Sequence, residues 1–137
     1  MARAGREPRG LLDTSVVIDL NRIDAGQLPL ELAISALTMA ELAAGPHATP
    51  DSAEKARRQD RLQRAEATFD PLPFDGDCAR AYGRVYAATI ATGRKARGPR
   101  AVDLLIAATA VAASLPLYTR NIDDFRGIEN ILEIIGV

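Results

Sequence analysis

Residues 101–113 are the segment that most constrains the fold of this chain. Apart from Asp103 and Thr109, the segment consists of alanine, valine, leucine and isoleucine, so a helix built from it has no polar face. A helix that is apolar on every side belongs inside a protein, covered by other elements. Pro99 stands where this helix is expected to begin, because a first turn needs no backbone donor from proline. The sequence therefore predicts a buried helix with one carboxylate, Asp103, near its start.

A carboxylate in the first turn of a helix has two interpretations. One is structural, because the positive end of the helix dipole stabilises the negative charge of Asp103. The other is functional, with Asp103 contributing to an acidic site. Three other acidic stretches of the chain favour the functional interpretation.

The composition describes one ordinary domain. The chain has 137 residues, of which 47% are hydrophobic and 26% charged, and its net charge is −1. Any contact with nucleic acid must therefore come from a local basic patch. A single cysteine and a single histidine argue against an intramolecular disulfide, a zinc site and a Cys-His nucleophile pair. No stretch has the roughly 18 apolar residues of a membrane span, and no signal peptide is visible, so we expect a cytoplasmic protein.

Three short apolar stretches are predicted to be strands, and acidic or amide residues follow each of them. Residues 10–12 lead into Asp13, residues 32–37 into a helix that carries Glu41, and residues 115–119 into a segment with Asn121, Asp123 and Asp124. Structural interpretations remain open, since Asp13 suits a turn. Glu41 also stands three residues after a threonine, which is the spacing of a capping box.

Strands that alternate with helices predict a three-layer α/β/α sandwich around a mostly parallel sheet. Helices are expected at residues 38–44, 50–69, 75–92 and 101–113, and a last strand at 131–135. Residues 1–10 are expected to be a flexible lead to a single domain at 11–137. Because the carboxyl ends of parallel strands meet at one edge of a sheet, the acidic residues are expected to gather there.

Carboxylates gathered at one point repel one another unless a cation lies between them. Oxygen ligands without histidine or cysteine favour Mg²⁺ or Mn²⁺ over zinc, and these ions keep several waters. The expected chemistry is the attack of a metal-activated water on a phosphodiester. A loop with four cations leads directly to Asp103 and is the candidate contact for a polyanionic backbone such as RNA or DNA, although such loops are also commonly just solvated: Arg94, Lys95, Arg97 and Arg100.

Four motifs carry a resemblance to a known family. They are LLDTSVVID at 11–19, ISALTMAELAAG at 34–45, DLLIAATA at 103–110 and LYTRNIDDF at 117–125. In this order and spacing they resemble the PIN-domain ribonucleases, and most closely the VapC toxins of bacterial VapBC toxin–antitoxin pairs. The resemblance covers the chain from residue 11 onward. It implies a Mg²⁺-dependent endoribonuclease with a compact α/β/α fold, usually a homodimer, that cleaves tRNA or ribosomal RNA. It also implies a VapB-type antitoxin that blocks the acidic groove.

Matched by position to the family, Asp13 and Asp103 correspond to metal ligands. Glu41 corresponds to a third acidic residue, which acts as a ligand or orients the attacking water. The family often has an acid where this chain has Asn121, so Asn121, Asp123 or Asp124 would complete the site, and Asp124 is our choice. This departure leaves the number of metal ions open. Two hydroxyl positions near the site in the family are matched here by Thr14 and Thr119, although both residues also suit a purely structural role as caps.

Two other functions compete with this prediction. A phosphatase of the haloacid dehalogenase type would need a second aspartate two residues after the first, where this chain has Ser15. A catalytically inactive PIN-like domain that binds RNA or a protein partner is the stronger alternative, because Asn121 replaces an acidic residue.

Overall fold

The centre of the molecule is a sheet of four parallel strands, seen in a computed structural model that describes residues 6–98 and 100–137. The strands of the described chain lie in the order β2-β1-β3-β4, so the first strand in sequence is central. This arrangement confirms the predicted parallel sheet. The strands are β1 (Arg9–Leu12), β2 (Glu31–Ile34), β3 (Leu117–Thr119) and β4 (Ile134–Gly136).

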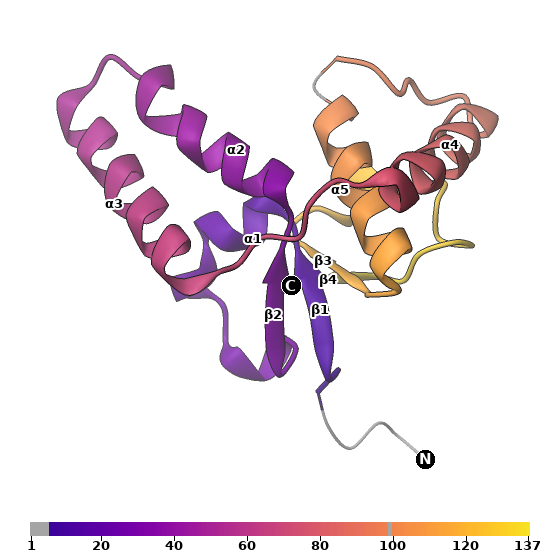
Figure 1. The fold of residues 1–137 in the computed structure, drawn as a ribbon, viewed down its shortest axis with the longest axis horizontal. Helices are drawn as coiled ribbons and strands as arrows, with labels where there is room; N and C mark the ends of the chain where they lie inside the picture. Colours follow the sequence, from indigo (N-terminus) through magenta and orange to yellow (C-terminus); the bar gives the residue numbers. More distant parts are fainter. Residues whose placement is uncertain (1–5, 99) are drawn as a thin grey trace.

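Helices cover both faces of the sheet, as expected for a three-layer sandwich. Figure 1 shows α1, α2 and α3 on one side of the strands and α4 and α5 on the other. Short 3₁₀ helices join some of these elements. The α-helices of the described chain are α1 (Thr14–Ile18), α2 (Ala36–Ala44), α3 (Ser52–Thr68), α4 (Gly76–Ala91) and α5 (Arg100–Ala113).

Alternation along β1 divides the core into two layers. Leu11 packs in the cluster that includes α4 and α5, whereas Leu12 packs in the cluster under α1, α2 and α3. Successive side chains of a strand point to opposite faces of the sheet, so one short strand serves both layers. The carboxyl ends of the strands are thereby fixed between the two groups of helices.

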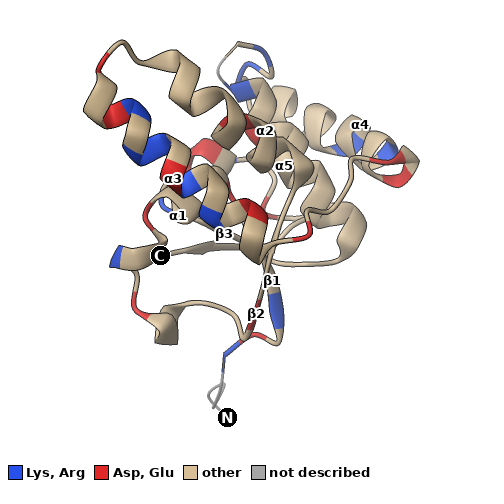
Figure 2. Cartoon of the chain, turned by 60° about the vertical axis from the view of Figure 1, so that its left-hand side comes forward, with Lys and Arg blue, Asp and Glu red and all other residues tan. Residues whose placement is uncertain are grey.

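Helix α5 is the buried helix that the sequence predicts. None of its residues is exposed, and six of them, from Leu104 to Ala110, are buried. Pro99, which we expected at the start of this helix, lies outside the described residues. Helix α3 is the opposite case, because Ala65 is its only buried residue. Its charges of both signs appear along the helix in Figure 2.

The amino-terminal lead differs from the expectation. Residues 1–5 lie outside the described residues, but β1 already begins at Arg9. The backbone carbonyls of Glu7 and Pro8 accept hydrogen bonds from the amides of Leu30 and Glu31, at 2.8 and 3.0 Å. The part of the lead from Glu7 to Gly10 is therefore fixed against β2, because backbone pairing extends beyond the apolar run that marks the strand.

Several element boundaries also differ from the predictions. Helix α2 begins at Ala36 with Ser35 as its N-cap, so Thr38 lies inside the helix and forms no capping box with Glu41. The Ser35 hydroxyl accepts the Thr38 amide at 3.1 Å. The last strand begins at Ile134. No helix in the described ranges combines the length and apolar character that crossing a bilayer requires.

Candidate functional site

Asp13 follows β1 directly and lies at the carboxyl edge of the sheet. Its side chain is 5% exposed and caps α1, because Oδ1 accepts the Val16 amide at 3.1 Å. The Ser15 hydroxyl donates to the same oxygen at 2.5 Å. Burial raises the pKa of Asp13, while hydrogen bonds from Ser15, Thr119 and Val16 oppose that rise. The carboxylate is therefore held in place by several donors.

Glu41 reaches the same edge from α2. The Thr14 hydroxyl donates to Glu41 Oε1 at 2.5 Å, and Thr38 Oγ1 lies 3.1 Å from Thr14 Oγ1. Thr38 is fully buried, whereas Glu41 is exposed. The hydroxyls thus fix one oxygen of a carboxylate that is open to solvent.

Asp103 lies in the first turn of α5 and is half-buried. The pKa of Asp103 is raised to about 6, mainly by burial and then by the negative charges of Asp124, Asp13 and Glu41 in that order, while the charge of Arg100 opposes the rise. A charge has this effect only when it is nearby. The structure therefore brings together the four carboxylates that the sequence singles out.

The segment after β3 contributes its residues unequally. It forms the 3₁₀ helix η4 (Ile122–Phe125), and Asn121 caps that helix by accepting the Asp123 amide at 3.3 Å. Asp123 forms an exposed ion pair with Arg126 at 2.6 Å. Asp124 is the residue of this segment whose charge acts on Asp103. The geometry thus favours Asp124 over Asp123 as the fourth acidic group.

The donor chemistry of these residues fits a hard divalent cation. The four carboxylates supply oxygen donors, which Mg²⁺ and Mn²⁺ prefer. Within the described residues, no group of three acidic, histidine or cysteine side chains is already arranged to hold a metal ion. Two carboxylates are turned instead toward hydroxyls, at Ser15 and Thr14.

The basic loop before α5 has two kinds of cation. Arg94 Nη1 donates to the Asp123 carbonyl at 2.6 Å, and Arg100 Nη1 donates to the Asp124 carbonyl at 2.7 Å. Lys95 and Arg97 are exposed, and neither has a partner among the described residues. The four side chains line an open hollow of about 370 Å³. Arg94 and Arg100 therefore hold the backbone of η4, which leaves Lys95 and Arg97 free to bind a ligand.

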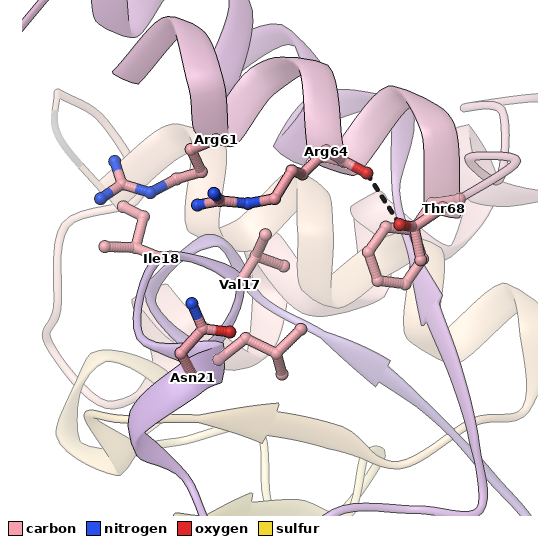
Figure 3. Close-up of a pocket in the computed structure, with 9 residues that line it drawn as sticks. Val17, Ile18, Asn21, Arg61, Arg64 and Thr68 are labelled. Atoms are coloured by element: carbon pink, nitrogen blue, oxygen red, sulfur yellow. Dashed lines mark hydrogen bonds between the residues drawn. The ribbon is translucent and has the colours of Figure 1, made fainter. Parts of the chain in front are cut away.

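A groove that the sequence did not indicate runs between α1 and α3. Figure 3 shows Arg61 and Arg64 extending from α3 across a hollow of about 170 Å³ that contains none of the four acidic residues. An adjoining hollow of about 400 Å³ shares Ile18 and Arg61 with it and reaches Glu41. The surface beside the acidic residues is thus hollowed toward α3.

Sequence reasoning also missed Ser15 as part of the site. The serine stands two residues after Asp13, and in the sequence it served only as an argument against a phosphatase of the haloacid dehalogenase type. Its hydroxyl instead joins Asp13 to the segment after β3, because it also accepts the Arg120 amide at 3.1 Å. A small hydroxyl residue beside a buried aspartate was the available signal.

Comparisons with known proteins identify the family of this chain. The PIN domain family matches residues 10–130. Ribonuclease VapC5 of Mycobacterium tuberculosis is 35% identical over 133 residues, which cover 93% of this chain and 95% of that protein. Ribonuclease VapC8 of the same species is 39% identical over 74% of this chain and 89% of its own length.

A solved structure gives the same answer at the level of the fold. The crystal structure of VapBC-5, a member of the VapBC family of toxin-antitoxin systems from Mycobacterium tuberculosis, matches with a TM-score of 0.83 and 35% identity. The match covers 95% of this chain and 99% of that one. The matches to VapC5 and VapBC-5 extend over nearly the whole length of both chains. Together with the family match, they show that the protein belongs to the PIN-domain family, among the VapC proteins.

Proposed function

We propose that this protein is a Mg²⁺-dependent endoribonuclease and the toxin of a type II toxin–antitoxin pair. The observation that carries the proposal is the effect of the charges of Asp124, Asp13 and Glu41 on Asp103 at one edge of the sheet. Relatives named ribonucleases VapC5 and VapC8 support the choice of RNA as substrate. PIN-domain nucleases generally depend on a divalent metal, which agrees with this acidic site.

The four carboxylates have distinct proposed roles. Asp13, Asp103 and Asp124 would hold Mg²⁺, or Mn²⁺ in its place, and Glu41 would act as a further ligand or orient the attacking water. When bound, the cation would supply charge neutralisation at the phosphate and an activated water. Asn121 lies next to this set with a neutral carbonyl oxygen. Thr14 and Thr119 keep the carboxylates oriented through their hydroxyls.

The basic loop would guide the RNA backbone to the acidic site. Lys95 and Arg97 are the proposed phosphate contacts, because they are exposed and have no partner within the described ranges. Arg94 and Arg100 would act on the same reaction indirectly, since both bind carbonyl oxygens of η4. The net charge of −1 makes such a local patch necessary for attracting a polyanion.

The proposed partners are a VapB-type antitoxin and a second copy of this chain. The structural relative VapBC-5 is a member of a toxin-antitoxin family, which supports the antitoxin. A homodimer is the usual state that the family resemblance implies. The proposed place of action is the cytoplasm, where the RNA substrates of such a toxin are found.

Cleavage of RNA by the purified protein tests the proposal. The protein, freed of antitoxin, is incubated with total RNA and Mg²⁺, next to the variants Asp13→Ala and Asp103→Ala. We expect discrete cleavage by the wild type and none by either variant. No cleavage by the wild type, or equal cleavage by the variants, would reject the nuclease.

A catalytically inactive binding module is the second candidate. It is favoured by Asn121, a neutral residue where the family often has an acid. Fluorescence titration of labelled RNA distinguishes the two, because a module binds RNA in Mg²⁺ without shortening it.

A further inference from the structure

Two consecutive backbone amides after β3 donate to two hydroxyls that hold Asp13. The Arg120 amide donates to Ser15 Oγ at 3.1 Å, and the Asn121 amide donates to Thr119 Oγ1 at 3.0 Å. Ser15 in turn donates to Asp13 Oδ1 at 2.5 Å, and Thr119 also hydrogen-bonds the Asp13 carboxylate. The backbone of this segment is thereby connected to Asp13 through two hydroxyls.

The direction of the Ser15 connection follows from the chemistry of a hydroxyl. A serine hydroxyl has one proton to donate and lone pairs that accept. An amide N–H can only donate, so the Arg120 amide takes a lone pair of Ser15 and leaves the proton for the carboxylate. Both bonds are then satisfied at the same time, and the oxygen of Ser15 is fixed between Arg120 and Asp13.

Ser15 connects parts of the site that are distant in sequence. Its bond to Arg120 joins residues 105 positions apart. The segment anchored there continues into η4, which carries Asp124. A second connection supports it, because Arg120 Nε lies 3.4 Å from Asp19 Oδ2 just after α1. The amino-terminal and carboxyl-terminal contributions to the acidic site therefore meet at Ser15.

We propose that Ser15 is a positioning residue that fixes Asp13 relative to the segment bearing Asp124, and that its hydroxyl sets the affinity of the acidic site for a divalent cation. This inference rests on the proposed metal-dependent function. It assigns to Ser15 a role beyond capping, because Asp13 already caps α1 through the Val16 amide. Groups that orient metal ligands typically change metal affinity by 10–100-fold when they are removed.

The substitution Ser15→Ala removes the hydroxyl with little other change. Ser15 is only half-buried, and alanine is the residue most favourable to a helix. The variant should therefore fold like the wild type, which its circular dichroism spectrum and Tm will show. Ser15→Thr keeps a hydroxyl and serves as the conservative variant. Ser52→Ala, at the exposed start of α3, is the matched control.

The main experiment measures Mn²⁺ binding to the metal-free full chain by calorimetry, without RNA. We expect Ser15→Ala to bind Mn²⁺ about 10-fold more weakly than the wild type. Ser15→Thr is expected within about threefold of the wild type, and Ser52→Ala unchanged, at the scale of one lost or retained orienting bond. Unchanged Mn²⁺ affinity in Ser15→Ala would overturn the inference, as would equal losses in Ser15→Ala and Ser15→Thr.

A second measurement follows the Arg120 amide itself. Hydrogen exchange of this amide should be at least about 10-fold faster in Ser15→Ala, because its acceptor is gone. An unchanged exchange rate would overturn the connection between Ser15 and the segment after β3. In RNA cleavage, Ser15→Ala should lower kcat and leave KM for RNA within about twofold, because the RNA contacts are intact.

These readouts separate the inference from the proposed nuclease. If the wild type binds Mn²⁺ but cleaves no RNA, the nuclease is rejected and the affinity of Ser15→Ala still decides the inference. A wild type that binds no Mn²⁺ would overturn the metal site and the inference together.

Discussion

Asp13 and Asp103 enter the same acidic site from different elements and are supported in opposite ways. Burial raises the pKa of both carboxyls. Around Asp13, three neighbouring residues donate hydrogen bonds that oppose the rise, whereas around Asp103 three carboxylates increase it. Hydrogen bonds therefore favour the charged form of Asp13, whereas the neighbouring charges favour the protonated form of Asp103.

The contrast shows that hydrogen bonds and neighbouring charges act in opposite directions on two carboxyls of one site. Hydrogen bonds from Ser15 and Thr119 stabilise the charge of Asp13 within the folded chain. At Asp103 the charge of Arg100 offsets the rise only in part, so a proton or a divalent cation would stabilise this group further. The next measurements test this division, beginning with the largest expected effect.

Loss of either ligand should abolish cleavage equally. Asp13→Asn and Asp103→Asn should each lower kcat/KM by at least about 10³-fold, which corresponds to several kcal/mol of transition-state stabilisation by a bound cation. Initial rates on a defined RNA substrate measure the effect. Asp123→Asn, at an exposed ion pair with Arg126, is the control and should change the rate less than about twofold. A large loss in the control would move the fourth ligand from Asp124 to Asp123.

The pH dependence should report Asp103. With its pKa at about 6, the carboxyl is mostly ionised at pH 7 and mostly protonated at pH 5. At low Mg²⁺ concentration, kcat/KM should fall about 10-fold between these values, because the cation requires the anion. Saturating Mg²⁺ competes with the proton and should move the midpoint to lower pH. A profile that ignores Mg²⁺ concentration would contradict the contrast between the two carboxyls.

The free cations of the basic loop precede Asp103 in the chain. RNA binding should therefore depend on the side of the site where Asp103 lies. Lys95→Gln and Arg97→Gln should each weaken RNA binding about fivefold and lower the salt dependence of log K by about one unit. Fluorescence anisotropy at several salt concentrations measures both. Lys55→Gln on the exposed side of α3 is the control and should leave binding unchanged. Equal effects of all three would indicate a diffuse attraction.

The smallest expected effect is on stability. In metal-free protein at pH 7.5, Asp103→Asn should raise the free energy of unfolding by about 1 kcal/mol, a value that allows for partial exposure. The sign follows from linkage. A carboxyl whose pKa is raised in the folded state makes the folded protein less stable as pH rises from about 4 to about 6. Asp13→Asn should gain less, because the hydrogen bonds at Asp13 favour its charge. Thermal melts in EDTA at pH 7.5 check that Asp103→Asn gains more stability than Asp13→Asn. The same melts at pH 4 check that these gains disappear in acid.

Local sequence patterns predict much of this arrangement. The apolar run at 101–113 predicts α5, and short apolar strands that end in acidic residues predict where Asp13 and Asp124 lie. Local patterns fail where two residues suit one role equally. The spacing of Thr38 and Glu41 suggested a capping box, but in the structure Ser35 is the N-cap of α2. They also give no signal for bonds between a hydroxyl and a distant backbone amide, such as that between Ser15 and Arg120.

The direction of long side chains is the other feature that the sequence leaves undetermined. The sequence alone does not distinguish the four cations between residues 94 and 100 from one another. In the structure, Arg94 and Arg100 turn inward to carbonyls of η4, while Lys95 remains in solvent. Arginine presents several donors on a long chain, and which carbonyls it finds depends on how η4 lies against α5.

The central place of β1 in the sheet has a consequence during synthesis on the ribosome. This strand is made early, yet its neighbour β3, which pairs Leu117 with Leu11, is made late. Until residues 103–124 have left the exit tunnel, the growing polypeptide lacks half of its acidic groups and the anchor for Ser15. The acidic site can therefore assemble only after residues 103–124 have left the ribosome and β3 pairs with β1.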